Sequence, residues 1–259
     1  MSRLRDQLRK VIPAPALETI RRIRAAIATR RDARSSREEV FTRIYRNREW
    51  GGVKGEFCSG DGSTQEAVVG PYVAAVLRVV RDNQLENSRF VDLGCGDFRV
   101  GRQLVGECAS YLGVDVVSAL VEHNNRQFAS DTVAFEYTDI VTSPLPSGDV
   151  CFVRQVLQHL DNAEISAILR KLEQFKLVFV TEHYPIGAYL QTRNLDQVHG
   201  RAIRLNRGSG VYLDAVPFNL PSRAISELLA VPGATGDPSG KADGVIRTFV
   251  LKPPFGLGL

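Results

Sequence analysis

A glycine-rich turn directly after a short apolar run constrains the fold of this chain more than any other feature of its sequence. Residues 90–101 read FVDLGCGDFRVG, so an apolar segment runs straight into Gly94 and Gly96. A turn of this kind between a buried strand and a helix lets the backbone approach a ligand closely, and helix N–H groups then point at that ligand. The alternative is an ordinary turn between a strand and a helix, so the neighbouring segments have to decide.

Short apolar runs alternate with helical patterns around this turn. The predicted strands are residues 89–93, 111–115, 133–138, 149–153 and 176–182. The segments with helical periodicity between them are residues 101–108, 117–128 and 162–175. Nearly continuous apolar strands separated by helices predict an α/β fold with a mostly parallel sheet and helices on both faces. Two later runs, 210–218 and 244–254, predict an antiparallel addition that closes the sheet at its C-terminal side.

The positive charge of the chain is concentrated at its N-terminus. Residues 1–40 carry eleven Arg and Lys against five Asp and Glu, which is +6; since the whole chain is +4, the remainder is −2. We predict a basic helical extension over 1–40, in two amphipathic pieces separated by PAP at 13–15. This extension either packs on its own domain or contacts an anionic membrane surface peripherally. The negative body, residues 41–259, argues against nucleic acid as a partner.

The composition favours a cytoplasmic enzyme or binding protein. No run approaches the roughly 20 apolar residues of a membrane span, and the basic N-terminus lacks the apolar stretch of a signal peptide. The four cysteines show no C-x-x-C spacing, so we predict reduced thiols and neither a disulfide framework nor a metal site. The expected location is the cytoplasm, with the basic extension able to bring the protein to the inner face of the membrane.

Three predicted strands end in or lead into a carboxylate. A dinucleotide-binding turn would have glycine where Arg99 stands, and Asp92 would repel a pyrophosphate but suits an ammonium group. S-adenosylmethionine has an ammonium group, a sulfonium and no phosphate. Asp115 then suits the ribose hydroxyls, while Asp139 suits the adenine amino group with Ile140 against the ring. Each acid alone could be a cap or a turn former, but three at successive strand ends predict this cofactor.

Residues 85–185 resemble the seven-stranded, Rossmann-like methyltransferases that use S-adenosylmethionine. VDLGCGDFRVG, YLGVD, TDI and DVCFVRQVLQHL are similar to their first four motifs. The resemblance implies a seven-stranded sheet and a cofactor site of Asp92, Gly94, Cys95, Gly96, Asp115, Val116, Asp139, Ile140 and Gln155. More narrowly, NREWGG, SGDGST, GCGDF and LQHL resemble methyltransferases of bacterial surface-glycan biosynthesis, in which an acidic residue often stands where Gln155 stands.

Methyl transfer to a hydroxyl requires that a proton leave, and a histidine suits that role. His159, one turn after the fourth strand, is the first candidate for the base, followed by His183 and Glu182 beyond the fifth strand. The aromatic, glycine-rich segment 41–64 is a candidate lid. The predicted acceptor-binding residues are Tyr45, Trp50, Arg154, Asp196 and His199.

The leading hypothesis is therefore O-methylation of a sugar hydroxyl in a cell-surface glycan or glycolipid precursor. A second reading keeps the cofactor and changes the acceptor to another small molecule, a protein or RNA. A third is a noncatalytic S-adenosylmethionine-binding subunit whose basic extension recruits a partner.

Overall fold

The computed structural model describes residues 14–233 and 244–256. The chain divides into two compact units, Met1–Ser36 and Arg37–Leu259. In the first unit, α2 (Ala14–Asp32) is the second of the two predicted N-terminal helices and has Arg30 and Arg31 in its last turn. The first predicted piece lies outside the described residues. Contact of this extension with a membrane stays a prediction.

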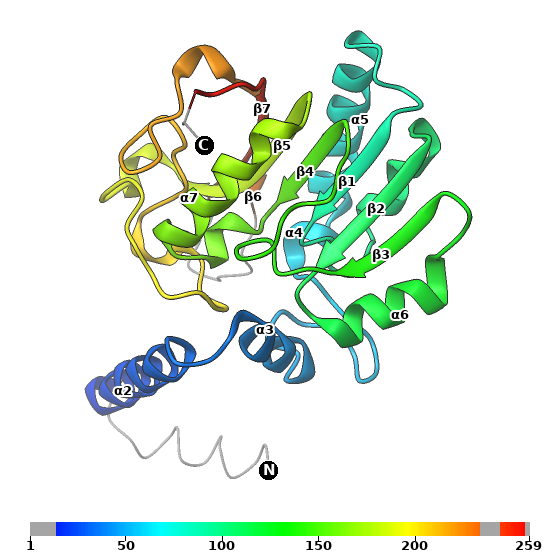
Figure 1. Cartoon of the computed structure of the whole chain (residues 1–259). Coiled ribbons are helices and arrows are strands. Elements are labelled where there is room, and N and C mark those ends of the chain that lie inside the picture. The colour runs from blue at the N-terminus through cyan, green and yellow to red at the C-terminus, as the bar shows by residue number, and fades with distance from the viewer. Residues whose placement is uncertain (1–13, 234–243, 257–259) are drawn as a thin grey trace. The chain divides into compact units, whose positions relative to one another are not determined.

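The second unit is built on one seven-stranded sheet (Figure 1). Its strands are β1 (Arg89–Leu93), β2 (Ser110–Asp115), β3 (Val133–Tyr137), β4 (Val150–Arg154), β5 (Leu177–Pro185), β6 (Ile225–Gly233) and β7 (Gly244–Leu251). They are arranged in the order β3-β2-β1-β4-β5-β7-β6. The first five run parallel, and β7 is antiparallel to both of its neighbours. The predicted fold class is confirmed.

Helices connect and cover these strands. The α-helices of the second unit are α3 (Arg37–Arg46), α4 (Asp61–Thr64), α5 (Glu66–Asp82), α6 (Ser118–Phe128) and α7 (Asn162–Lys171). Short 3-10 turns are η1 (Gly101–Gln103), η2 (Val105–Glu107), η3 (Leu157–His159), η4 (Leu172–Gln174), η5 (Gly187–Tyr189), η6 (Arg204–Arg207) and η7 (Ser222–Ala224).

The sheet is buried on both faces because successive side chains of a strand point to opposite sides. In β4, Cys151 and Val153 join the core under α7, whereas Val150 and Phe152 join the core under α5. Figure 1 shows α7 in front of the sheet and α5 behind it. Parallel strands that are covered in this way need continuous apolar runs, which is the pattern of the sequence.

The chain reverses its direction of travel across the sheet at β1, which pairs with β2 on one side and β4 on the other. Ligands of open α/β sheets bind beyond the carboxyl ends of the strands at such a switch point. The glycine turn after β1 and the segment after β4 both lie there.

Helix α7 starts immediately after the η3 turn and is fixed by a capping box. The Asp161 carboxylate accepts a hydrogen bond from the Glu164 backbone N–H at 2.7 Å, and Glu164 Oε2 accepts one from the Asp161 N–H at 3.0 Å. Such a reciprocal cap satisfies two otherwise unpaired backbone donors. The capping box therefore fixes the start of α7 at Asn162 and with it the end of the loop that follows β4.

Two sequence predictions about the secondary structure are wrong. Residues 210–218 form no strand; β6 is Ile225–Gly233, inside the segment that the two predicted strands were expected to flank. Val211, Leu213 and Phe218 are buried as an irregular segment of the core instead. Residues 101–108 form two 3-10 turns rather than a helix, in keeping with the poor helix propensity of their two glycines.

Within residues 14–233 and 244–256, none of the helices combines the length and the apolar character needed to cross a lipid bilayer.

Candidate functional site

The turn after β1 is tight enough that only glycine fits at two of its positions. Gly94 and Gly96 have φ values of 73° and 55°, which are left-handed conformations. A Cβ atom at Gly94 would lie 2.6 Å from Val156 Cγ2, and one at Gly96 would lie 2.3 Å from Ser59 Oγ. The turn is tied to β2, because the Gly94 and Cys95 N–H groups both donate to the Val114 carbonyl. Close approach of backbone and neighbouring walls therefore explains both glycines.

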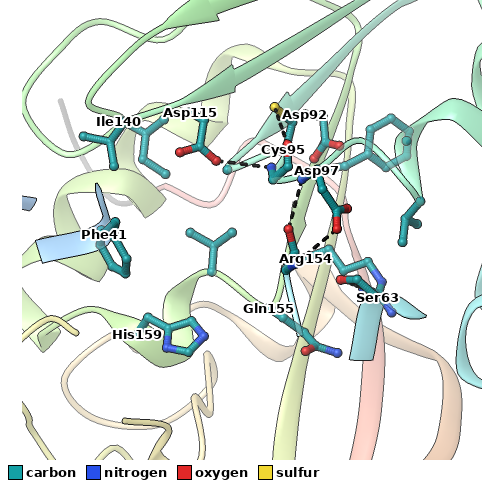
Figure 2. Close-up of a pocket in the computed structure, with 18 of the residues that line it drawn as sticks. Phe41, Ser63, Asp92, Cys95, Asp97, Asp115, Ile140, Arg154, Gln155 and His159 are labelled. Atoms are coloured by element: carbon teal, nitrogen blue, oxygen red, sulfur yellow. Dashed lines mark hydrogen bonds between the residues drawn. The ribbon is translucent and has the colours of Figure 1, made fainter. Parts of the chain in front are cut away.

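A pocket opens beyond this turn, at the carboxyl ends of β1, β2 and β4 (Figure 2). Every residue predicted to bind the cofactor lines it: Asp92, Gly94, Cys95, Gly96, Asp115, Val116, Asp139, Ile140 and Gln155. Figure 2 shows Asp115 and Ile140 on one side of the pocket and His159 and Gln155 on the other. The predicted strand ends thus converge on one cavity.

Asp115, the last residue of β2, is held by the turn itself. Its Oδ2 accepts a hydrogen bond from the Gly96 N–H at 3.2 Å and its Oδ1 one from the Val117 N–H at 3.0 Å. Burial raises its pKa to about 6, although these N–H groups act in the opposite direction. Each carboxylate oxygen has further lone pairs, so the group can still accept two hydroxyls.

Asp92, near the end of β1, is buried beside the same turn. The Tyr111 hydroxyl donates a hydrogen bond to its Oδ2. Burial raises its pKa to about 6, against the effects of the Tyr111 bond and of the nearby Arg154 charge. An ionised carboxylate without a cation in contact is costly at such a site, so this group favours a positively charged ligand.

Arg154, the last residue of β4, is a half-buried cation in the pocket wall. Its Nη2 donates to the Gly62 carbonyl at 2.6 Å and its Nη1 to Ser63 Oγ at 3.3 Å, while the guanidinium lies 5.0 Å from the Tyr72 ring centroid. Its Nε is buried and has no hydrogen-bond partner among the described residues. Burial lowers its pKa. A guanidinium in this setting favours an anion as its ligand.

Gln155 follows β4 in a left-handed conformation, with φ of 56°. Its N–H donates to the Thr181 carbonyl at 2.6 Å, and its Nε2 is buried without a hydrogen-bond partner among the described residues. Strained conformations of non-glycine residues of this kind cluster at functional sites. The side-chain amide offers the pocket a donor where an acidic residue would offer an acceptor.

Asp139, after β3, differs from the other two carboxylates because it already has a cation. The Arg37 guanidinium donates to both of its oxygens and to Glu164 Oε1, and Glu164 Oε1 also contacts His199 Nδ1 at 2.8 Å. Burial alone would raise the pKa of Asp139, but hydrogen bonds from Arg37 and from the Val141 N–H bring it below its ordinary value. This network joins the start of α3, β3, α7 and the loop around residue 199.

Segment 37–64 forms one wall of the pocket, as the lid hypothesis for 41–64 would require. Phe41, Tyr45, Trp50 and Ser59 line the cavity. The Tyr45 and Trp50 rings are 5.2 Å apart in an edge-to-face arrangement, and the Tyr45 hydroxyl lies 3.1 Å from Ser59 Oγ. Ser59 also exchanges two hydrogen bonds with Asp97, just after the glycine turn.

His159 lines the pocket as a neutral imidazole. Burial lowers its pKa to about 4, although the Gly200 carbonyl acts in the opposite direction. Its Nδ1 lies 3.0 Å from that carbonyl, so the neutral ring donates there and leaves Nε2 as an acceptor. The ring packs 5.1 Å from Trp50. His159 is therefore the predicted base that the structure places in the cavity.

Glu182 and His183 do not line the pocket. The fully buried Glu182 carboxylate accepts the Val156, Leu157 and Gln158 N–H groups, at 3.2, 2.8 and 3.1 Å. Burial raises its pKa to about 8, against these three bonds. Its observed contacts are those of a group that shapes the loop carrying His159. His183 lies against Gly233, at the end of β6.

Asp196 and His199 also lie outside the pocket lining. Asp196 Oδ1 accepts the N–H of Asn162 at 2.8 Å, at the start of α7. His199 is part of the Glu164 network. Of the predicted acceptor-binding residues, the structure brings Tyr45, Trp50 and Arg154 to the cavity.

Sequence reasoning missed Arg37, Ser59 and Asp97. Arg37 was counted with the basic extension, and nothing local indicates that it crosses to Asp139. Asp97 carried a usable signal, because it follows Gly96 directly in GCGDF. Among the described residues, no group of three or more His, Cys, Asp or Glu side chains is placed to hold a metal ion.

Comparisons with known proteins identify a methyltransferase domain in part of the chain. Residues 90–175, less than half of the chain, match the family model described as Methyltransferase domain. No curated protein matches the sequence.

Solved methyltransferases have similar folds at low identity. N-methyltransferase NodS from Bradyrhizobium japonicum WM9, in complex with S-adenosylhomocysteine, is 14% identical with a TM-score of 0.49, over 73% of this chain and 88% of that one. Magnesium protoporphyrin IX methyltransferase from Synechocystis PCC 6803, also with S-adenosylhomocysteine, is 17% identical with a TM-score of 0.49, over 83% and 98%. At these values the likeness decides nothing about the chemistry of this chain.

Proposed function

We propose that this protein, whose residues 90–175 match a methyltransferase domain, uses S-adenosylmethionine to methylate a sugar hydroxyl in a precursor of a cell-surface glycan or glycolipid. The observation that carries the proposal is the setting of His159. A neutral imidazole in the cofactor pocket, with Nδ1 on the Gly200 carbonyl and its ring against Trp50, combines a proton acceptor with an aromatic wall. A sugar hydroxyl offers a proton to lose and an apolar C–H face.

The residues of the pocket fit the cofactor. The two glycines let the turn after β1 pack closely against Val156 and Ser59 at the edge of the pocket. Asp92 and Arg154, both within the described residues, carry opposite charges in one cavity without a direct ion pair between them. An amino-acid group can bind between them, with its ammonium toward Asp92 and its carboxylate toward Arg154. We therefore assign Arg154 to the cofactor rather than to the acceptor.

The remaining cofactor contacts follow the strand ends. Asp115 can accept the ribose hydroxyls, and Ile140 offers an apolar surface to the adenine ring. Asp139 lies at that end of the pocket with its carboxylate bound to Arg37. When bound, S-adenosylmethionine supplies a methyl group on a sulfonium, which an oxygen lone pair can attack.

The protein's own part in the reaction is to orient the acceptor, exclude water and take its proton. His159 Nε2 would accept the hydroxyl proton as the oxygen–methyl bond forms and the sulfur–methyl bond breaks, and the Nδ1–H bond to the Gly200 carbonyl would stabilise the resulting imidazolium. Phe41, Tyr45 and Trp50 form the wall that keeps water out. Alignment of the reacting atoms in the pocket can supply about 7–11 kcal/mol of the barrier.

The test is transfer of labelled methyl from S-adenosylmethionine into a glycolipid fraction, with the methylated sugar identified after hydrolysis. We expect His159→Gln to lower kcat about 100-fold or more, which is the usual contribution of a general base, without changing S-adenosylhomocysteine affinity. His123→Gln, on α6 and outside the pocket lining, is the matched control. Label in protein or RNA instead of sugar would refute the acceptor class. Tight cofactor binding with no transfer to any fraction would favour a noncatalytic subunit.

A further inference from the structure

A second cavity, of about 300 Å³, lies beyond the antiparallel side of the sheet and shares no lining residue with the cofactor pocket. Tyr184 from β5, Arg247 from β7 and Glu227 from β6 line it, together with Arg193, Tyr212 and Asp214 from the segment between β5 and β6. Neither the proposed methyl transfer nor the cofactor uses any of these side chains.

The aromatic part of this cavity is held rigidly. Tyr184 is 2% exposed, its hydroxyl donates to the Val211 carbonyl at 2.6 Å, and its ring meets Tyr212 edge-to-face at 5.2 Å. The buried Asn194 fixes the Tyr212 backbone, accepting its N–H at 2.7 Å and donating to its carbonyl at 2.8 Å. The binding surface is therefore formed before any ligand arrives, which lowers the entropic cost of binding.

Two guanidinium groups lie over these rings. Arg193 is 5.0 Å from the Tyr212 ring centroid, and Arg247 is 5.8 Å from that of Tyr184. Arg247 pairs with Glu227 at 3.1 Å, yet its Nε is buried without a hydrogen-bond partner among the described residues. No Asp or Glu in the described part of the chain lies within ion-pair distance of Arg193. The charge of Arg247 is thus neutralised by Glu227, whereas the guanidinium donors of Arg193 remain available to a ligand.

This combination selects a class of ligand. The partly exposed Tyr212 ring suits the apolar C–H surface of a sugar, and carboxylates beside forked guanidinium donors suit its vicinal hydroxyls. The Arg193 guanidinium, which has no Asp or Glu partner among the described residues, adds a preference for an acidic substituent, which a planar guanidinium binds through two parallel hydrogen bonds. We infer that this cavity is a second binding site, for a sugar unit that carries a carboxylate or a phosphate.

The inference goes beyond the proposed function and does not require it, because binding is measured without methyl transfer. The probes are glucuronate, glucose 6-phosphate, glucose and inorganic phosphate, titrated into the full-length protein by calorimetry and by amide chemical-shift mapping. We expect both acidic sugars to bind and to shift the Asn194 and Tyr212 amides. Glucose and inorganic phosphate are each expected to bind at least tenfold more weakly, since each offers only half of the recognised chemistry.

Variants locate the site. Arg193→Gln, at an exposed position, is expected to weaken both acidic sugars about tenfold, and Arg193→Lys by less, because lysine keeps the charge but not the fork. Arg223→Gln makes the same charge change on the adjoining η7 turn without touching the cavity lining and is expected to stay within twofold of wild type. S-adenosylhomocysteine affinity should be equal in all three.

Four results would overturn the inference. The first three are no binding of either acidic sugar at 10 mM, equal losses in Arg193→Gln and Arg223→Gln, and binding of glucose as tight as that of glucuronate. The fourth is chemical-shift changes confined to the cofactor pocket, which would assign the acidic sugar to the acceptor site.

Discussion

The two ends of the cofactor pocket treat their carboxylates differently. At the glycine turn, Asp92 and Asp115 are buried without an ion-pair partner among the residues that the structure describes, and their pKa values rise to about 6. At the far end, Asp139 is neutralised by Arg37, and its pKa falls below the ordinary value. The carboxylates at the glycine turn can therefore pair with a positively charged group of the ligand. The Asp139 carboxylate is already paired with Arg37 at the start of α3. Binding energy should concentrate at the glycine turn.

The largest effect should come from Asp115→Asn. The change removes the charged acceptor for two ribose hydroxyls, and charge-assisted hydrogen bonds are worth about 1.5–3 kcal/mol each. We expect S-adenosylhomocysteine affinity, measured by calorimetry, to fall about 100-fold. Asp131→Asn, at an exposed position before β3, should leave it unchanged. Unchanged affinity in Asp115→Asn would remove the ribose role.

Arg154→Gln tests the cationic half of the same end. We expect S-adenosylhomocysteine to bind about thirtyfold more weakly, because a buried charge-assisted bond to its carboxylate is lost. Methylthioadenosine, which lacks the amino-acid group, should bind as to wild type. Equal losses of affinity for both ligands would make Arg154 a purely structural residue. No loss of affinity for either ligand would favour the sequence-based prediction that Arg154 binds the acceptor.

The pH dependence of binding sharpens the comparison further. The pKa values of Asp92 and Asp115 in the folded protein lie above the ordinary 3.8, so protonation of these groups stabilises the folded state without ligand. This contribution to the free energy of unfolding is fully present below pH 3.8 and is lost as the pH rises through about 6. The ammonium group of the ligand needs Asp92 in its ionised form, so affinity should move the opposite way. S-adenosylhomocysteine should bind about tenfold more weakly at pH 5 than at pH 7. A flat profile over this range would contradict the assignment of these carboxylates.

The smallest effect on affinity should come from Arg37→Gln, at the neutralised end. We expect S-adenosylhomocysteine affinity to change by threefold or less. The free energy of unfolding should fall by about 1–2 kcal/mol, which lowers Tm by about 2–4 °C per kcal/mol in a chain of this size. Calorimetric binding and thermal unfolding check both parts. A loss of affinity as large as that in Asp115→Asn would mean that Arg37 itself contacts the ligand.

Much of the cofactor side was predictable because its information is local. A strand that ends in a glycine turn fixes where its last side chains point, so Asp92 could be placed from its own segment, and Asp115 from the end of the next strand. Gln155 followed instead from the resemblance of DVCFVRQVLQHL to a methyltransferase motif. The parallel strands β1 to β5 were predicted for the same reason, since each is a continuous apolar run.

The acceptor side was less predictable because its partners come from distant segments. Glu182 stands at a strand end as Asp92 does, yet its carboxylate turns to three backbone N–H groups of another loop. His199 lies on Glu164 rather than in the cavity. The apolar pattern of 210–218 was mistaken for a strand, because burial in an irregular core segment and burial in a sheet need the same residue types.

The wall formed by segment 37–64 is fastened at both of its ends, by Arg37 to Asp139 and by Ser59 to Asp97. A ligand that leaves past this wall requires one of these two contacts to open, so we expect the lifetime of the bound S-adenosylhomocysteine product to depend on them. Turnover would then be governed by how often the wall loosens, and weakening either fastening would speed product escape even where it leaves the reacting groups untouched.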